Sequence, residues 1–268
     1  MLPSASDRFL AELPDDALVL DVGGWAAPLN RADWVIDLQP HATRGDMGSF
    51  GPGPEHFSAE TWVVRDICDR EPWPFADDQF DFAVCVTTLE DVRDPMWVCS
   101  ELSRVARAGY VEVPTVLAEL IYNVEGNGQH LGHEHHRWIV DIATQPPSEA
   151  GTGGEELVFL HKPHNIHHDW TLRVTPRMRA QMAMEEELQG LFWQGEVRAR
   201  ERVVIYEYPL EELRARVRAR FPASPAEQRA KEIRAAAAHQ LARARLPVRR
   251  AAARAFEAGQ ALIDRRAS

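Results

Sequence analysis

The segment 126–138, GNGQHLGHEHHRW, holds the densest group of chemically active side chains in the sequence. His133, His135 and His136 lie within four residues of one another, and residues 117–170 contain 8 of the 11 histidines. A neutral imidazole can take up a proton near neutral pH or bind a metal ion. The glycines and the asparagine around these histidines predict a loop. The segment therefore predicts a site for acid–base or metal chemistry.

Acidic residues and a glycine pair mark a second candidate site nearer the N-terminus. Asp21 is followed by Gly23 and Gly24, and Asp37 and Asp66 end two later apolar segments. Glycine lets the backbone approach a ligand closely because it has no Cβ atom. A carboxylate can accept hydrogen bonds from two neighbouring hydroxyl groups, such as the diol of a ribose. This pattern predicts a binding site for a molecule that contains a ribose.

Short apolar segments, which are typical of buried parallel strands, lead into each of these acids. The expected strands are residues 17–22, 34–37, 61–66, 80–86 and 110–114. Between the last two, residues 94–105 carry apolar side chains three to four positions apart, with Pro95 near their start, which predicts an amphipathic helix. Strands that alternate with helices favour an α/β fold, with a parallel sheet covered by helices on both faces. Since ligands bind at the carboxyl edge of such a sheet, we expect the acids to meet there.

The second half of the chain has a different composition and predicts further elements. Residues 137–142, 157–161 and 197–208 have strand-like patterns. From about residue 226 the chain is rich in Ala and Arg, which predicts peripheral helices divided at Pro247. We therefore expect three regions: a cofactor-binding core at 1–116, an acceptor-binding insertion that completes the sheet at 117–208, and a basic helical extension at 209–268.

Three motifs follow one another within the first 116 residues. They are VLDVGG at 19–24, DICDREPWPFADDQFD at 66–81 and TLEDVRDP at 88–95. The first is similar to the opening motif of class I S-adenosylmethionine-dependent methyltransferases, and the other two resemble the subgroup that includes the ubiquinone-pathway methyltransferases. The resemblance covers about residues 17–116. It implies a Rossmann-like sheet and an enzyme that takes a methyl group from S-adenosylmethionine.

The resemblance also implies which residues contact the cofactor, with Asp37 on the ribose diol and Asp66 on the adenine amino group. The full set is Asp21, Gly23, Gly24, Asp37, Leu38, Asp66 and Ile67. Two positions depart from the family pattern, because the usual Gly-x-Gly is Gly23-Gly24-Trp25 and the histidine that usually follows Leu-Glu is Asp91. A nicotinamide dinucleotide enzyme, the alternative on a similar fold, needs a G-x-G-x-x-G motif that residues 23–28 do not supply.

Three roles are open for the histidine segment. The histidines can cap and bridge a loop, His135 or His136 can remove a proton from a hydroxyl acceptor, or Glu119 and His136 can hold Mg²⁺ or another divalent metal. A general base would accelerate methyl transfer to an alcohol by ~10²–10⁴-fold, because the oxygen is a poor nucleophile until its proton leaves. The later group of His161, His164, His167, His168 and Asp169 is expected to line the acceptor cleft.

The acceptor region is polar and contains Trp138 and Trp170, which can stack on sugar faces or belong to the core. Glu119 followed by a Gly-x-x-His-His-x-Trp-like loop resembles bacterial methyltransferases associated with polysaccharides, and some sugar methyltransferases require magnesium. Two lysines against 28 arginines indicate a GC-rich actinobacterial source. We therefore expect O-methylation of a sugar or glycan, with a mannoside as the specific candidate. The alternatives are a lipid or quinone acceptor, which would need an apolar pocket, and a non-catalytic binding protein with the same sheet.

Charge and cysteine content restrict the partners and the compartment. Residues 198–268 carry 17 Lys and Arg against 8 Asp and Glu, whereas the rest of the chain carries 13 against 33. An acidic body argues against nucleic acid, and no apolar run is long enough for a membrane helix. We expect a small-molecule or oligosaccharide acceptor as partner, and a homo-oligomer is left open. The N-terminus lacks the features of a secretory signal and the three cysteines fit no disulfide framework, which favours the cytoplasm.

Overall fold

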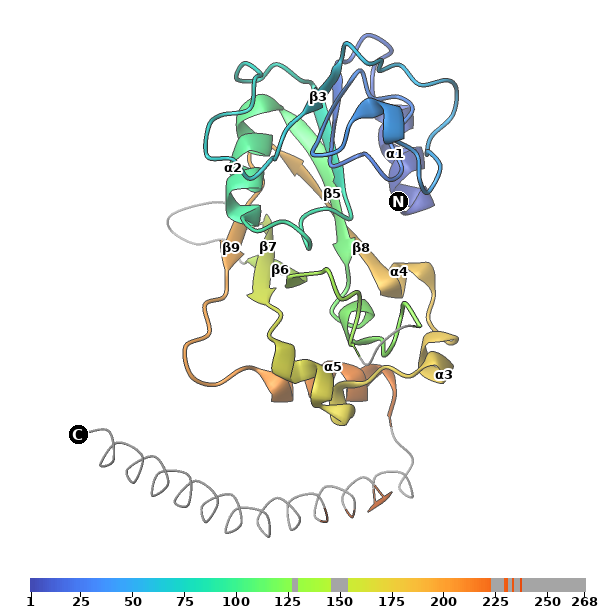
Figure 1. Ribbon diagram of the computed structural model, residues 1–268, viewed down its shortest axis with the longest axis vertical. Coiled ribbons are helices and arrows are strands. Elements are labelled where there is room, and N and C mark those ends of the chain that lie inside the picture. Colours follow the sequence, from blue (N-terminus) through green and yellow to red (C-terminus); the bar gives the residue numbers. More distant parts are fainter. Residues whose placement is uncertain (127–129, 146–153, 223–228, 231–232, 234–236, 238–268) are drawn as a thin grey trace, which may run out of the picture. The chain divides into compact units, whose positions relative to one another are not determined.

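A computed structural model of the protein describes residues 1–126, 130–145, 154–222, 229–230, 233 and 237 (Figure 1). The chain divides into two compact units, Met1–Val217 and Arg218–Ser268. The elements that form the sheets belong to the first unit. In the second unit, the expected helices from about residue 226 and their division at Pro247 lie almost entirely outside the described residues.

The first unit is built on a six-stranded sheet in the order β3-β2-β1-β4-β5-β8. Its strands are β1 (Val19–Val22), β2 (Trp34–Asp37), β3 (Trp62–Val64), β4 (Phe82–Val86), β5 (Ala108–Pro114) and β8 (Leu188–Gln194). Strands β1 to β5 are parallel, and β8 runs antiparallel beside β5. The predicted parallel Rossmann-like sheet is confirmed. The boundary predicted at residue 116 falls inside the first unit, just after β5.

Strand β8, which the sequence did not single out, completes the sheet at its β5 edge. Gly190 and two glutamines interrupt its apolar pattern, so that no clear strand signal remains. Gly190 is required there because a Cβ atom would overlap the hydroxyl of Tyr110 on β5. Leu191 and Trp193 nevertheless bury their side chains in the core.

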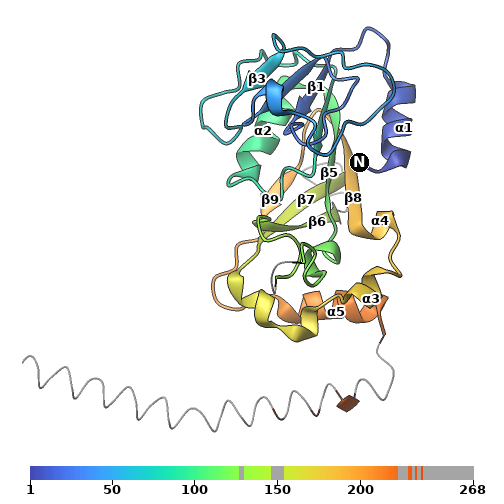
Figure 2. The ribbon, with the colours of Figure 1, turned by 45° about the vertical axis from the view of Figure 1, so that its right-hand side comes forward.

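Apolar side chains cover both faces of the sheet, and the ribbon shows a helix on each side of it (Figure 2). On one face, helix α1 (Pro3–Glu12) packs Phe9 against Phe82, with the ring centroids 5.3 Å apart. On the other face, helix α2 (Pro95–Val105) buries Val98 and Leu102. The Asp94 side chain caps α2 by accepting a hydrogen bond from the Trp97 amide at 3.1 Å, which is the entry signal expected of a helix start. The helix predicted at 94–105 is therefore confirmed.

A second sheet of three strands packs into the same core as α2. It consists of β6 (Trp138–Gln145), β7 (Gly154–His161) and β9 (Ala199–Glu201), in the order β6-β7-β9. The strand predicted at 197–208 is wrong beyond residue 201. Val203, Ile205 and Tyr206 alternate in the sequence as a strand would, but their side chains are exposed and have no face to pack against.

Short helical elements connect these strands and bring the chain back to the sheet edge. They are η1 (His41–Thr43), η2 (Ala118–Leu120), η3 (His164–His168), η4 (Trp170–Leu172), α3 (Pro176–Arg179), α4 (Met184–Glu187) and α5 (Leu210–Arg220). The connection from β1 to β2 is a loop, with no helix between residues 23 and 33. Among the helices in the described residues, none has the length and apolar character required to cross a membrane.

Gly109 on β5 packs closely against both neighbouring strands, β4 and β8. A Cβ atom there would overlap the Ala83 carbonyl oxygen and lie 2.6 Å from Trp193 Cζ2. Because a backbone oxygen cannot rotate away, we expect Gly109→Ala to lower the free energy of unfolding by about 1–3 kcal/mol in urea titrations. Gly154→Ala is the control, since its Cβ would meet only the flexible end of Arg198 at 3.1 Å. Equal stabilities for the two variants would contradict this account of β5.

Candidate active site

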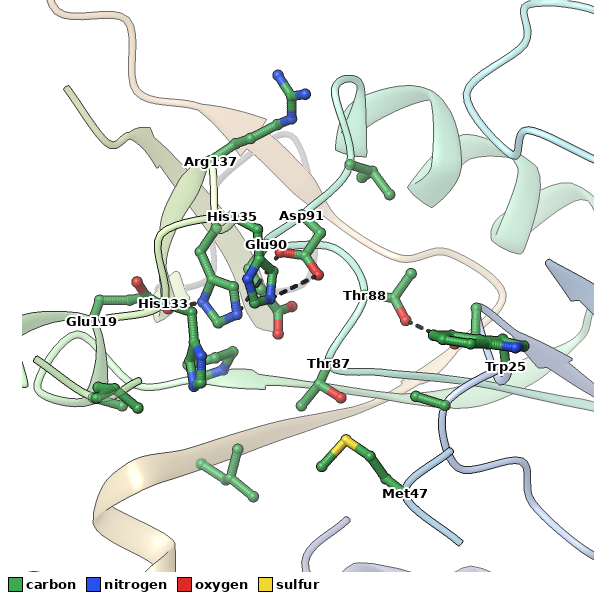
Figure 3. Close-up of a pocket in the computed structure, with 18 of the residues that line it drawn as sticks. Trp25, Met47, Thr87, Thr88, Glu90, Asp91, Glu119, His133, His135 and Arg137 are labelled. Atoms are coloured by element: carbon green, nitrogen blue, oxygen red, sulfur yellow. Dashed lines mark hydrogen bonds and ion pairs between the residues drawn. The ribbon is translucent and has the colours of Figure 1, made fainter. Parts of the chain in front are cut away.

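A cavity of about 1150 Å³ lies at the carboxyl ends of β1, β2, β4 and β5. Its walls come from the residues that follow these strands, from η2, from the loop 133–137 and from α4 (Figure 3). Single-ligand pockets usually measure about 300–1,000 Å³. The cavity is therefore large enough to hold two small molecules next to each other.

Gly23 and Thr88 form the part of the wall at which the strand order reverses between β1 and β4. Gly23 has a φ of +77°, and a Cβ atom on it would overlap the Thr88 side chain. The Thr88 hydroxyl lies 3.4 Å from the Gly23 carbonyl oxygen and 3.0 Å from that of Val86. The backbone of β1 and the turn after β4 thus approach each other as only a glycine allows.

Asp21 and Gly24, two of the predicted cofactor residues, do not line the cavity. The buried Asp21 carboxylate instead accepts a hydrogen bond from the Leu29 amide at 2.8 Å, and a Cβ atom on Gly24 would overlap this carboxylate. Burial, opposed in part by the Leu29 hydrogen bond, raises the pKa of Asp21 to about 7. Both residues therefore shape the loop 23–29 from behind, and their direct contact with a cofactor stays a prediction.

Asp37 and Leu38, at the end of β2, do line the cavity. The Asp37 carboxylate is largely buried and accepts hydrogen bonds from the amides of Gln39 at 2.7 Å and Trp25 at 3.0 Å. Burial raises the pKa of this carboxyl group, although these amides act in the opposite direction. A carboxylate can accept about four hydrogen bonds. Asp37 thus keeps acceptor capacity for a diol.

Asp66 and Ile67 contribute the next part of the wall, after β3. The Asp66 carboxylate pairs with Arg93 and accepts a hydrogen bond from the Cys68 amide at 2.9 Å. Burial alone would raise its pKa, but the bonds from Arg93 and Cys68 outweigh burial and lower it. Asp66 is therefore ionised. Sequence reasoning missed Arg93 because nothing in its position within the motif 88–95 shows that it would reach across to Asp66.

At the other end of the cavity, the buried Glu119 holds His136 in place and is itself paired with the buried Lys162. His136 Nδ1 lies 2.5 Å from Glu119 Oε1, and Lys162 Nζ donates to Glu119 Oε2 at 2.7 Å and to the His133 carbonyl at 3.0 Å. Burial would raise the pKa of Glu119, but the His136 and Lys162 interactions lower it. Because an ionised carboxylate accepts, His136 Nδ1 is the nitrogen that donates to Glu119, and Nε2 is the ring nitrogen that this bond does not use. Sequence reasoning missed Lys162, one of only two lysines in the chain.

His133 and His135 share a second carboxylate. Their Nδ1 atoms lie 3.3 Å and 3.6 Å from Glu125 Oε1. On the cavity side, Nε2 of His135 and of His136 lie 3.9 Å and 3.8 Å from the two oxygens of Asp91. Figure 3 shows His133 and His135 at one end of the cavity lining and Trp25 at the other. The predicted residues Glu119, His135 and His136 are thus brought together.

Glu90 is the buried acid that sequence reasoning did not single out. It lines the cavity, its side chain is 0% exposed, and neither carboxylate oxygen has a hydrogen-bond partner among the described residues. Burial, with smaller contributions from the charges of Asp91 and Glu119, raises its pKa well above the ordinary range. An unpartnered buried carboxyl group is costly, and such groups concentrate at functional sites.

The second histidine group does not line the cavity. His167 Nδ1 accepts from the Leu131 amide at 3.0 Å, and Asp169 begins η4 and pairs with Arg214 at 2.6 Å. Trp170 is also absent from the lining, and Trp138 is buried in the core, where its Nε1 donates to the Val92 carbonyl at 2.8 Å. The expected sugar-stacking role of these tryptophans is therefore wrong for this cavity.

Asp21 gives the protein a pH-dependent stability. An unfolded aspartate has a pKa near its ordinary value, so between about pH 4 and 7 the folded state binds more protons, and stability falls as pH rises. At about 1.4 kcal/mol per pH unit, the wild type should lose roughly 2–3 kcal/mol between pH 5 and 7.5 from this group. Asp21→Asn should lose that component in urea unfolding measured at both pH values. Parallel pH profiles for the two proteins would refute the assignment.

Comparisons with known proteins agree with the motifs in the first half of the chain. Residues 52–111 match the model of a methyltransferase domain, and this segment covers β3, β4, α2 and the start of β5. This part of the sheet is thus similar to a methyltransferase domain. A search of curated proteins finds no match.

Several solved structures of methyltransferases are similar to part of the chain. A putative methyltransferase from Bacillus halodurans is 18% identical, over 42% of this chain and 51% of that one, with a TM-score of 0.32. A SAM-dependent methyltransferase from Aquifex aeolicus is 18% identical, over 41% and 64%, with a TM-score of 0.29. A possible histamine N-methyltransferase from Thermotoga maritima is 17% identical, over 57% and 81%, with a TM-score of 0.33. The chain spans about half the length of the first structures that it matches.

Proposed function

We propose that the protein is an S-adenosylmethionine-dependent methyltransferase that methylates a hydroxyl group, most specifically on a sugar or glycan. One observation carries this proposal. A single cavity joins Gly23, Asp37 and Asp66 at the ends of the first three strands to His135 and His136 at its other end. One end thus offers groups that suit a nucleoside, and the other offers groups that can accept a proton.

The residues at the nucleoside end fit S-adenosylmethionine. The glycine turn at Gly23 leaves no room for a Cβ atom and exposes backbone to the cavity. Asp37 is buried, held by two amides, and retains acceptor capacity for a ribose diol. The ionised Asp66 can accept a hydrogen bond from an amino group. When bound, S-adenosylmethionine supplies a methyl group carried on a positively charged sulfur.

The histidine end supports activation of an acceptor hydroxyl. The acceptor oxygen forms the new O–C bond, the C–S bond breaks with its electron pair left on sulfur, and the hydroxyl proton goes to an imidazole nitrogen. His136 is the best-placed base, because Glu119 fixes its ring and leaves Nε2 free, and His135 lies beside it. A divalent ion on the same nitrogens would serve the same purpose by lowering the pKa of a bound hydroxyl.

The lining favours an acceptor with a polar part and an apolar part. Arg137 and Arg179 join the histidines and Asp91 on the polar side, which suits the hydroxyl groups of a sugar. Apolar side chains that line the cavity include Ile121, Val124, Met184 and Leu188. We therefore place a glycoside with an apolar aglycone first, with a mannoside among the sugars to be tried. The apolar side chains also favour, as second candidate, a lipid or quinone-like acceptor.

Asp37 tests the cofactor half of the proposal. Asp37→Asn keeps an oxygen for the neighbouring amides but removes the charge that a ribose diol would bind. We expect its affinity for S-adenosylmethionine and S-adenosylhomocysteine, measured by calorimetry, to fall by ~1.5–3 kcal/mol, the usual strength of a hydrogen bond to a charged group. Asp7→Asn, on the exposed side of α1, makes the same charge change and should bind as the wild type does.

Failure of the wild type to bind either molecule would refute the proposed function. If Asp37→Asn bound as tightly as the wild type, the ribose contact would be wrong. Binding without any formation of S-adenosylhomocysteine from a panel of mannosides, other glycosides and phenols would instead support the non-catalytic binding protein. Turnover only with hydrophobic phenols would replace the sugar by the second candidate.

Substitution of His136 tests the proposed proton transfer from the acceptor hydroxyl. His136→Gln can still donate a hydrogen bond to Glu119 but cannot take up a proton. If His136 is the base, the single-turnover rate should fall by ~10²–10⁴-fold while the affinity for S-adenosylhomocysteine stays unchanged, because the lost interaction belongs to the transition state. His135→Ala, at the more exposed ring, distinguishes the two histidines. Full activity of both variants would leave the histidine loop a structural role only.

A further inference from the structure

We propose that His133, His135, His136 and Asp91 form a binding site for a divalent transition-metal ion, such as Zn²⁺, at the acceptor end of the cavity. One ligand nitrogen from each of the three rings lies within 4.8 Å of the other two. Three histidines of one short loop thus gather at one part of the cavity wall. Imidazole nitrogens that lie close together are a common ligand set for such an ion.

The orientation of the rings supports this assignment. Each Nδ1 atom faces a carboxylate, with Glu125 serving His133 and His135, and Glu119 serving His136. A histidine that binds a metal usually donates its other ring N–H to a carboxylate, which fixes the tautomer and leaves the ligand nitrogen free. His133 and His136 therefore have the second contact expected of a ligand, and His135 Nδ1 lies 3.6 Å from the carboxylate that His133 contacts.

Asp91 supplies the oxygen ligand. Its Oδ1 atom is buried without a hydrogen-bond partner among the described residues. Its oxygens lie 3.8 Å and 3.9 Å from Nε2 of His136 and His135, which is too long for a hydrogen bond. Around a tetrahedral ion, ligand atoms that each lie about 2.1 Å from the metal are roughly 3.4 Å apart, so each of these pairs must close by about 0.5 Å. The 4.8 Å spacing of the ring nitrogens needs a closure of up to about 1.4 Å, which rotation of the partly exposed rings of His133 and His135 can provide.

The surrounding charge also favours a cation. Glu90, fully buried and adjacent to Asp91, has two carboxylate oxygens with no hydrogen-bond partner among the described residues. Glu119 adds a negative charge, and Lys162 neutralises only part of this group. A bound divalent ion is often the largest local charge of a site and stabilises nearby carboxylates. The unpartnered Glu90 is therefore a second buried acid of this cavity that no described side chain or amide satisfies.

The choice of metal follows from the ligands. Three imidazoles favour Zn²⁺, Co²⁺ or a similar ion, whereas Mg²⁺ prefers oxygen ligands. Both oxygens of Glu119 already bond to His136 and Lys162, so Glu119 orients a ligand instead of serving as one. This replaces the pairing of Glu119 and His136 as ligands that the sequence suggested. An ion with these ligands can keep a position for the acceptor hydroxyl, whose pKa it would lower. That last role rests on the proposed function, whereas ion binding itself does not.

The test is direct metal binding to the full-length chain, freed of any histidine tag and stripped with a chelator. Zn²⁺ is titrated by calorimetry, and Co²⁺ is added separately to record its visible absorption, which reports nitrogen ligation. We expect one ion per chain, with Mg²⁺ unable to compete at equal concentration. His135→Ala and Asp91→Asn should weaken Zn²⁺ binding at least tenfold, and Glu119→Gln by ~10–100-fold, as for other partners of metal ligands.

His164→Ala is the matched control, because it removes an exposed histidine of the second group. It should leave Zn²⁺ affinity unchanged. Loss of binding in His164→Ala together with retention in His135→Ala would overturn the assignment, as would a wild type that binds neither ion. The side chain of His135 is 60% exposed, so its removal should leave the fold intact, which circular dichroism can verify.

Measuring S-adenosylhomocysteine affinity on the same metal-free samples separates the two proposals. Cofactor binding without metal binding would overturn the metal site and leave the proposed methyltransferase standing. Metal binding without cofactor binding would support the metal site and overturn the proposed methyltransferase. If both bind, chelator treatment should abolish turnover of whichever acceptor is found and Zn²⁺ or Co²⁺ should restore it, and chelator-insensitive turnover would remove the ion from the reaction.

Discussion

The buried carboxylate of Glu119 holds together three segments that are far apart in the sequence. Glu119 itself lies in η2 after β5, His136 lies in the loop before β6, and Lys162 directly follows β7. Gly132 packs over the group, since a Cβ there would lie 2.6 Å from Glu119 Oε2. A buried charge is tolerated only when it is paired, and removing one partner commonly costs about 3–5 kcal/mol. The histidine loop is therefore fixed to the edge of the sheet by buried, charged hydrogen bonds.

This anchoring explains why the two halves of the cavity face each other. The parallel strands bring Asp37 and Asp66 to one edge, because the carboxyl ends of neighbouring strands meet there. The chain then leaves β5, passes Glu119 and returns with the histidines to the same edge. The sheet thus positions Asp37 and Asp66, and a loop held by buried ion pairs positions the histidines.

The same edge concentrates carboxyl groups in a poorly solvated place. Asp21, Glu90 and Asp91 all have raised pKa values, with burial as the largest cause in each case. Such crowding opposes folding, because ionised carboxyl groups lose hydration and repel one another. Arrangements of this kind persist where a ligand or ion needs them, and the cavity contains Glu90 and Asp91 but not Asp21. Asp21 offsets its burial by holding the loop through Leu29.

The sequence alone determined the parallel sheet and the edge at which the site lies. Strands such as β1 and β4 are buried on both faces, so they read as continuous apolar runs that only a covered parallel sheet explains. The sequence could not reveal β8, in which Gly190 is required because a Cβ atom would overlap the Tyr110 hydroxyl. Nor could it reveal that Val203, Ile205 and Tyr206 are exposed outside any strand. Only the tertiary structure decided that Trp138 belongs to the core, that Lys162 pairs with Glu119 and that Glu90 has no partner. The physical reason is that strand patterns depend on near neighbours in the chain, whereas burial and ion pairing depend on contacts between residues tens of positions apart.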